Sequence, residues 1–311
     1  MTHPPHELIR SGAIRTSQAV GEALASGRPV VALESTIFSN LGLPAPANAD
    51  ALHSCQEVLR AAGVEPAITA VLDGVARVGL QPGEEERVLR ATTKLAERDL
   101  AVAIAQEIEA GVTTVSATVS LAHAAGISVF ATGGIGGVHR GVDSSWDISA
   151  DLDALAHHPV ITVCAGAKAF LDLPKTLEYL ETAGVPVLGW QHDWFPAFYT
   201  RSSGLPIPHR VETTREVAAV LRNRLRPETG VLLTVPIPEE HELDASELQA
   251  KLDSALAAAD VQRVTGAAVT PFILGLIEQE TAGESIPANV ALALNNARLA
   301  AAVATELASG V

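Results

Sequence analysis

The chain has 311 residues, of which 48% are hydrophobic and 18% charged, a composition typical of a folded globular protein. Acidic residues outnumber basic ones by 36 to 21, and the net charge of -15 argues against a nucleic-acid-binding surface. The first residues contain no apolar signal-like region, and no apolar run approaches the length of a membrane span. We therefore expect a cytoplasmic protein with no nucleic-acid or membrane partner. Cys55 and Cys164 lie in apolar surroundings and are expected to be reduced thiols.

Short β-prone runs alternate along the chain with helical patterns. The first half is predicted to contain a helix over 17–25, a strand over 29–33, a helix over 49–62, strands over 67–72 and 76–80, helices over 82–91 and 100–110, a strand over 113–117, a helix over 118–125 and a strand over 128–132. The second half is predicted to contain a strand over 160–164, a helix over 175–182, a strand over 185–189, a loop over 190–208, a helix over 212–224, a strand over 230–235, and helices over 245–259, from 270 and over 286–307. The Asp73-Gly74 pair between two of these strands favours a hairpin turn.

No linker-like stretch divides the chain, so the alternation predicts one α/β domain over residues 1–311, in which residues 1–14 are expected to be loose. The predicted loop over 190–208 carries five of the eleven aromatic residues. Loops of that length often serve as lids or interfaces, and the sequence leaves both possibilities open.

Glu34 directly follows the strand predicted over 29–33. A carboxylate beside a buried strand is costly unless it is paired or functional. Glu34 is therefore a candidate site residue, and the alternative is a carboxylate that caps a nearby turn.

Lys94 and Arg98 precede the helix predicted over 100–110. Free backbone N–H groups at a helix N-terminus attract anions, so these cations could receive a phosphate. An ordinary solvated charge run explains the same pattern. The glycine run over 133–137 lets backbone approach a ligand, but it fits neither the dinucleotide fingerprint nor a P-loop.

Three carboxylates, Asp147, Asp151 and Asp153, follow that glycine run. Carboxylates so close together repel one another unless a cation intervenes, which suits a hard divalent metal. A helix N-cap built around Ser149 explains them equally well. His139 could donate to an anion, although a lone histidine is more often structural.

Lys168 stands among small apolar residues after the strand predicted over 160–164. Burial disfavours an ammonium group, and a neutral amine can attack a carbonyl carbon. The alternative is a lysine whose stem is buried and whose head reaches water.

Several blocks of the chain together resemble the pseudouridine-5′-phosphate glycosidase family, also called indigoidine synthase A-like. They read VALESTI, PAITAVLDGVARVGL, TTVSATV, ATGGIGGVHRGVDSSWDISADL, VCAGAKAFLDLPKTLEYLETAGVPV, FPAFYTRSSGLPIPHRV, TPFIL and NNA. The blocks cover about residues 15–305 in the family's order. The resemblance implies a single-domain α/β/α layered fold with a mostly parallel central sheet, assembled as a homotrimer. It also implies an enzyme that reversibly cleaves pseudouridine 5′-phosphate to uracil and ribose 5-phosphate, with Mn²⁺ or a similar divalent cation.

The resemblance further assigns roles to residues of this chain. Lys168, in CAGAK, is the nucleophile that forms a Schiff base with ring-opened ribose, and Glu34, in ALEST, is the proton donor. Asp147 is the metal ligand. The substrate-binding positions are Lys94, Val115, His139, Ser149, Ala150 and Asp151, with Asn296 as a candidate for reading uracil. One departure is Glu97, where the family often has a basic residue, and it puts the phosphate affinity in doubt.

Two other functions remain open on the sequence. A Schiff-base sugar-phosphate aldolase or lyase would use Lys168 in the same way but would release a pair of carbonyl compounds. A phosphate-binding module without catalytic activity would bind ligand without turnover, and it leaves the coexistence of Glu34, Asp147 and Lys168 unexplained.

Overall fold

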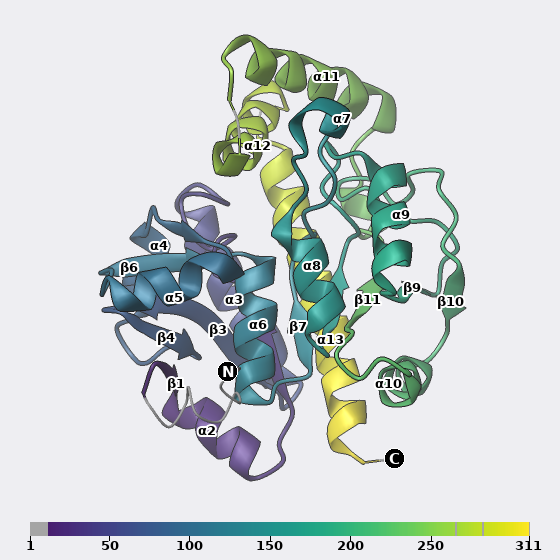
Figure 1. Cartoon of the computed structure of the whole chain (residues 1–311). Coiled ribbons are helices and arrows are strands. Elements are labelled where there is room, and N and C mark those ends of the chain that lie inside the picture. Colours follow the sequence, from purple (N-terminus) through teal and green to yellow (C-terminus); the bar gives the residue numbers. More distant parts are fainter. Residues whose placement is uncertain (1–11, 265, 282, 311) are drawn as a thin grey trace.

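An eleven-stranded sheet runs through the part of the chain that the computed structural model describes, residues 12–264, 266–281 and 283–310 (Figure 1). The strands are β1 (Ile14–Thr16), β2 (Val30–Leu33), β3 (Glu65–Leu72), β4 (Val75–Val78), β5 (Lys94–Leu95), β6 (Ala110–Thr113), β7 (Val129–Ala131), β8 (Ile161–Cys164), β9 (Val187–Trp190), β10 (His209–Val211) and β11 (Val231–Thr234). Most of the N-terminal segment that was expected to be loose lies outside the described residues, but Ile14 belongs to β1.

The strands follow the order β1-β4-β3-β2-β7-β8-β11-β9-β10, with β6 beside β3 and β5 beside β6. Only β4 and β6 run antiparallel to their neighbour β3, so the sheet is mostly parallel. Leu33 of β2 pairs with Ala131 of β7, which pairs with Val163 of β8. The carboxyl ends of these three strands are therefore level with one another.

Helices cover both faces of the sheet, as the resemblance implied. They are α2 (Gln18–Ala25), α3 (Ala47–Ala61), α4 (Glu85–Arg90), α5 (Glu97–Ala105), α6 (Val115–Ala125), α7 (Val142–Ser145), α8 (Ala150–His157), α9 (Leu173–Ala183), α10 (Thr214–Asn223), α11 (Ala245–Val261), α12 (Val269–Glu280) and α13 (Ser285–Ala308). On one face α6, α8 and α9 pack in succession, and on the other α13 lies between α3 and α10. Figure 1 shows the first group in front of the sheet, the long α13 behind it, and α11 with α12 at one end.

The hairpin signal at Asp73-Gly74 is confirmed. β3 and β4 pair antiparallel, and both turn residues have positive φ angles, 50° at Asp73 and 66° at Gly74. That geometry suits the right-handed twist of the two strands.

The strand predicted over 113–117 is wrong, because β6 ends at Thr113 and α6 begins at Val115. The local run of threonine and valine favours extended backbone, but tertiary hydrogen bonds override that preference. The hydroxyls of Ser35, Thr69, Thr113 and Thr118 form one fully buried cluster, with oxygen–oxygen distances of 2.8 to 3.2 Å. These bonds fix the end of β2 against the start of α6.

The middle of the segment over 190–208 packs into the core, whereas several residues on either side of it are exposed. Phe195, Phe198 and Tyr199 are buried, whereas the side chain of Trp194 is half exposed. The backbone N–H of Phe198 donates to the carbonyl of Ala165 at 3.0 Å. The aromatic residues therefore support the chain just before Lys168.

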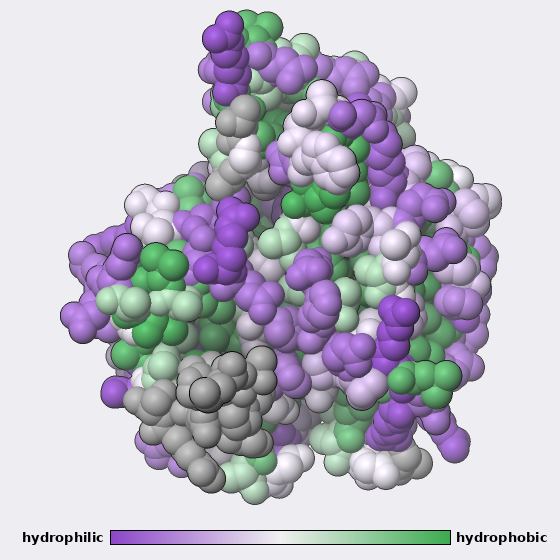
Figure 2. Space-filling view, in the orientation of Figure 1, coloured by the Kyte–Doolittle hydropathy of each residue, from purple (hydrophilic) through white to green (hydrophobic). Residues whose placement is uncertain are grey.

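Among the described residues, no helix combines the length and the apolar character that crossing a bilayer requires. On the face of the molecule in Figure 2, hydrophilic residues are interspersed with small hydrophobic areas. Cys55 and Cys164 are both buried free thiols, as expected.

Candidate active site

Three neighbouring parallel strands end at the same edge of the sheet, and the candidate catalytic residues follow them directly. Glu34 follows β2, Thr132 follows β7, and Lys168 comes four residues after the end of β8. The chain leaves β2 toward β3 and leaves β7 toward β8, on opposite sides. A crevice opens where strand connections diverge in this way, which is the usual place for a ligand in an open α/β sheet.

A cavity of about 280 Å³ lies at this edge, and most of the site residues predicted from the sequence line it. Its lining includes Glu34, Lys94, Val115, His139, Asp147, Ser149, Ala150, Asp151 and Lys168. Arg98, the other candidate phosphate ligand, also lines it. Residues more than 130 positions apart in the chain thus share one cavity with the donors and acceptors that a sugar phosphate needs.

Glu34 is 8% exposed, and burial raises the pKa of its carboxyl group above the ordinary value. The positive charge of Lys168 and a hydrogen bond from the hydroxyl of Thr132 to Oε1 oppose that shift without cancelling it. A carboxyl group that stays protonated in this way can act as a proton donor.

The segment that carries Lys168 is held against the glycine loop by backbone hydrogen bonds. Ala165 N–H donates to the carbonyl of Gly133 at 2.9 Å, and Lys168 N–H donates to that of Ile135 at 3.1 Å. Gly166 has a φ of +77°, and a Cβ there would lie 2.0 Å from the carbonyl oxygen of Pro196. Only glycine fits this turn, which fixes the half-buried Lys168 at the cavity.

The cations in the cavity lie close enough to affect one another. Burial lowers the pKa of Lys94, and the charge of Lys168 lowers it further. Burial likewise lowers the pKa of His139, with Lys168 and Lys94 adding to the effect against the charge of Asp147. An anionic ligand would relieve this repulsion, so the cluster is suited to bind phosphate.

Asp151 joins two segments of the cavity wall through its carboxylate. Oδ1 accepts from the backbone N–H of Ser116 at 2.9 Å, at the first turn of α6, and Oδ2 accepts from that of Gly136 at 2.8 Å. Its negative charge at a helix N-terminus is also favourable for the helix dipole. Ser149 caps α8, because its hydroxyl accepts from Asp151 N–H at 3.2 Å.

The prediction that three carboxylates share one metal is therefore wrong, and the N-cap interpretation is confirmed for Ser149. Asp153 is exposed, and one oxygen lies 3.3 Å from Nδ1 of His157, whereas each oxygen of Asp151 accepts a backbone N–H. No group of three or more His, Cys, Asp or Glu side chains in the described ranges is arranged to hold a metal ion.

Asp147 remains available as a ligand. Its Oδ2 lies 3.8 Å from Nδ1 of His139, and its side chain is 33% exposed at the cavity. One carboxylate suits a cation such as Mg²⁺ or Mn²⁺, because such ions often keep several waters and bind substrate phosphate as well. The donors present therefore fit a cation held jointly with the substrate, and they do not form a complete protein cage within the described part of the chain.

Asn296 does not reach the cavity, contrary to its proposed role at uracil. Its Nδ2 donates to the carbonyls of Thr132 and Gly133, at 2.7 and 3.2 Å, and its side chain is fully buried. Asn289, two turns earlier on α13, lines the cavity instead, and its buried Oδ1 has no hydrogen-bond partner among the described residues. Sequence reasoning missed Asn289 because only the packing of α13 shows which amide faces the site.

Glu97, the departure from the family pattern, points away from the site. Burial raises the pKa of its carboxyl group, but the hydrogen bond and charge of His158 outweigh that effect and lower it overall. Oε1 lies 2.6 Å from Nε2 of His158, and Glu97 is not among the described residues that line the cavity. The carboxylate of Glu97 is therefore engaged with His158.

Comparisons with known proteins identify the family of the chain. Residues 19–306 match the family model described as indigoidine synthase A like protein. The chain is 48% identical over 300 residues to the pseudouridine-5′-phosphate glycosidase of Myxococcus xanthus, covering 95% of this chain and 98% of that protein. It is 50% identical over 296 residues to the enzyme of the same name from Methylobacterium nodulans, covering 93% and 86%.

Two solved structures share the fold. The prealnumycin C-glycosynthase AlnA, solved in complex with ribulose 5-phosphate, has a TM-score of 0.87 at 34% identity and covers 96% of this chain and 97% of its own. An indigoidine synthase A-like protein from Thermotoga maritima has a TM-score of 0.85 at 32% identity, covering 95% and 96%. The chain belongs to the indigoidine synthase A-like family, whose curated relatives are pseudouridine-5′-phosphate glycosidases.

Proposed function

We propose that this protein reversibly cleaves the C1′–C5 bond of pseudouridine 5′-phosphate, giving uracil and ribose 5-phosphate. The observation that supports this most strongly is the placement of Glu34 and Lys168 in one cavity, where the charge of Lys168 acts on a buried carboxyl group. The names of the relatives support the substrate, and the ribulose 5-phosphate complex of AlnA supports a pentose phosphate as the kind of ligand.

The bond to be broken explains why an amine is needed. Ordinary glycosidases work with two carboxylates because their leaving group departs through a heteroatom. Here the leaving atom is carbon, and the bonding electrons must be accepted at C5 of uracil. An amine at C1′ assists because its lone pair can form an iminium as the carbon–carbon bond breaks.

The proposed reaction has three steps. The neutral amine of Lys168 displaces the ring oxygen from C1′, and that oxygen takes up a proton. The C1′–C5 bond then breaks, the nitrogen lone pair forms the C=N bond, and C5 receives the proton of Glu34. Water adds to the iminium and releases ribose 5-phosphate and the free amine of Lys168, and the proton set free by this hydrolysis returns to Glu34. A positioned acid such as Glu34 typically contributes about 10²- to 10⁴-fold to the rate.

The phosphate is assigned to the cationic part of the cavity. Lys94, Arg98 and His139 line that part, together with Val115 at the N-terminal turn of α6. Lys94 and His139 both have a lowered pKa through burial and neighbouring positive charge, which a bound dianion would reverse. Binding of the phosphate would then place C1′ between Glu34 and Lys168.

We also propose that Asp147 holds Mn²⁺ or a similar divalent cation. The cation would supply positive charge to the phosphate and to ordered water when it is bound. His139 lies beside Asp147, and its backbone N–H donates to the carbonyl of Asp147 at 3.0 Å, so the two residues keep a fixed relation. A homotrimeric assembly and a cytoplasmic location follow from the family resemblance, and sedimentation analysis tests the assembly.

The central experiment incubates the protein with pseudouridine 5′-phosphate and Mn²⁺ and measures free uracil. Lys168→Ala is expected to abolish uracil release, and Lys175→Ala, which removes an exposed lysine, is expected to leave it intact. Borohydride with ribose 5-phosphate should attach the sugar to Lys168. Release of two carbonyl products in place of uracil would assign an aldolase or lyase, and cleavage by Lys168→Ala at the normal rate would exclude the covalent role.

A further inference from the structure

Two short segments, 137–139 and 147–149, pair side by side and present polar residues to the cavity. Ser149 N–H donates to the carbonyl of Gly137 at 3.0 Å, and His139 N–H donates to that of Asp147 at 3.0 Å. An isolated antiparallel bridge joins Val138 to Ile148 between these bonds. This paired segment therefore fixes His139, Asp147 and Ser149 relative to one another at the cavity.

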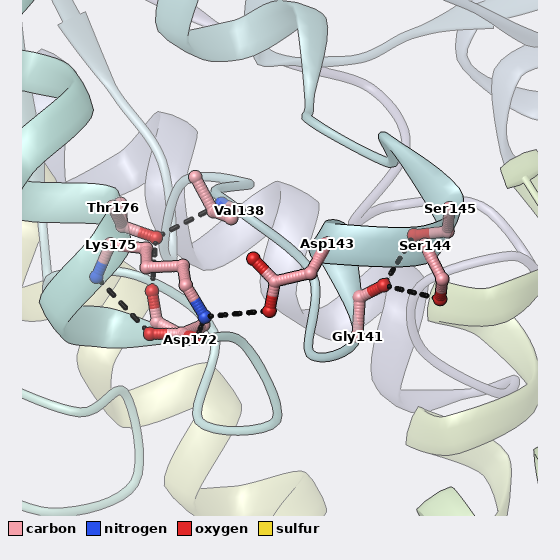
Figure 3. A network of polar contacts seen from close by, with 8 residues as sticks. All are labelled: Val138, Gly141, Asp143, Ser144, Ser145, Asp172, Lys175 and Thr176. Carbon is pink, nitrogen blue, oxygen red and sulfur yellow. Dashed lines mark hydrogen bonds and ion pairs between the residues drawn. The ribbon is translucent and has the colours of Figure 1, made fainter.

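The opposite edge of Val138 is held by residues that do not line the cavity. Val138 N–H donates to Oγ1 of Thr176 at 3.0 Å (Figure 3). Asp172 N–H donates to the carbonyl of Val138 at 2.9 Å. The same hydroxyl of Thr176 donates to the carbonyl of Asp172 at 2.8 Å. The hydroxyl of Thr176 thus accepts the Val138 N–H in place of the backbone carbonyl that a neighbouring strand would supply.

The contact between Thr176 and the paired segment is close, and it leaves no room for another acceptor of the Val138 N–H. Thr176 is fully buried, and a Cβ added to Gly137 would lie 2.4 Å from its Oγ1. Val138 is 3% exposed, so water cannot readily replace the hydroxyl as acceptor for its N–H. A side chain of the same shape without an oxygen would leave that N–H unpaired.

The exposed part of the same network consists of ion pairs made by Lys175. Nζ of Lys175 lies 2.8 Å from Oδ2 of Asp172 and 3.6 Å from Oδ2 of Asp143, and its side chain is 45% exposed (Figure 3). Exposed ion pairs of this type hold geometry weakly. Lys175 therefore offers a matched control one residue away from Thr176.

We propose that Thr176 is a positioning residue, whose hydroxyl sets where His139 and Asp147 meet the phosphate end of the substrate. This inference rests on the proposed function. Lys168 is held by its own backbone bond to Ile135, and Glu34 by Thr132, so neither depends on the hydroxyl of Thr176. The loss of Thr176 Oγ1 should therefore weaken substrate binding more than bond cleavage.

The test compares Thr176→Val, Thr176→Ser and Lys175→Ala by steady-state kinetics with pseudouridine 5′-phosphate. Thr176→Val is expected to raise KM about tenfold, the equivalent of one misplaced charged contact, with kcat changed by less than about twofold. Thr176→Ser restores the hydroxyl and should return KM to within about twofold of the unmodified protein, where Lys175→Ala should also stay. Amide hydrogen exchange over 137–149 should speed up in Thr176→Val alone.

The inference is overturned if folded Thr176→Val keeps a normal KM, or if Thr176→Ser is impaired as severely as Thr176→Val. A loss confined to kcat also overturns it. If Thr176→Val does not fold, Gly137→Ala replaces it, because the added Cβ pushes the same paired segment away from Thr176. A normal KM in Gly137→Ala then overturns the inference. Failure of the proposed function is distinct, since the unmodified protein would then release no uracil while the exchange comparison still reports on the paired segment.

Discussion

The hydroxyl of Thr132 donates a hydrogen bond to Oε1 of Glu34, inside a site where both residues are buried. The carbonyl of Thr132 in turn accepts from Asn296, so an amide on α13 orients the threonine. The bond stabilises the charged carboxylate and partly opposes the effect of burial on its pKa. It also occupies one carboxyl oxygen, which leaves the other free to carry the proton.

Thr132→Val is therefore expected to raise the pKa of Glu34 further, because the variant removes a contact that lowers it. The protonated acid then persists to higher pH, so the alkaline limb of the kcat profile moves upward. Thr132→Ser keeps the hydroxyl and serves as the control. The measurement is the dependence of kcat on pH across both limbs of the profile. An alkaline limb that stays in place or moves to lower pH in Thr132→Val contradicts the assignment of Glu34 as proton donor.

Removal of the proposed metal ligand Asp147 should change the response to Mn²⁺. Asp147→Asn is expected to raise the half-saturating Mn²⁺ concentration by about tenfold or more, because a neutral amide binds a hard cation weakly. Asp153→Asn removes an exposed carboxylate from the same stretch and should leave the response unchanged. Titration of Mn²⁺ after chelator treatment, with binding followed by calorimetry, provides the measurement. Equal Mn²⁺ responses in the two variants would contradict the proposal that Asp147 binds the cation.

Asn289 should contribute to recognition of the base. Its Oδ1 is buried at the cavity with no partner in the described residues, so a uracil N–H would satisfy it. Loss of one such hydrogen bond in Asn289→Ala is expected to raise KM by about tenfold. Asn295, whose Nδ2 donates to the carbonyl of Pro236 at 3.3 Å, is the control from the same helix. If ribose 5-phosphate binding falls as much as substrate binding, Asn289 does not act on the base.

The buried hydroxyl cluster beneath Glu34 should stabilise the fold. Thr69 Oγ1 lies 2.8 Å from Thr113 Oγ1 and 2.9 Å from Thr118 Oγ1, so Thr69→Val leaves buried hydroxyls with fewer partners. We expect the free energy of unfolding in urea to fall by about 1–3 kcal/mol. Thr162 is equally buried on β8, but its hydroxyl has no partner in the described structure.

Thr162→Val is the matched control for Thr69→Val. It removes a hydroxyl that is buried without compensation, so the free energy of unfolding should stay constant or rise by up to about 1 kcal/mol. Urea denaturation of the two variants side by side gives the comparison. A larger loss in Thr162→Val than in Thr69→Val would contradict the role of the cluster.

The sequence by itself determined the strand-and-helix alternation, the hairpin at Asp73-Gly74 and the positions of Glu34 and Lys168 after buried strands. These features depend on local signals, since hydrophobic runs and turn residues act over a few neighbouring positions. Parallel strands then bring such strand ends to one edge, which is why the cavity contains the residues predicted for it. The start of α6 was missed because a buried hydroxyl cluster, which is not local, sets it.

Only the tertiary structure decided which polar side chains near the cavity hold the backbone in place and which ones face a ligand. Asp147, Asp151 and Asp153 look equivalent in the sequence, yet the first two line the cavity, only Asp151 accepts two backbone N–H groups, and Asp153 is exposed. Asn289 and Asn296 lie on the same helix, but α13 buries one against Thr132 and turns the other to the cavity. The physical reason is that a buried polar group takes whichever partner the packed elements bring to it, and those partners lie far away in the chain.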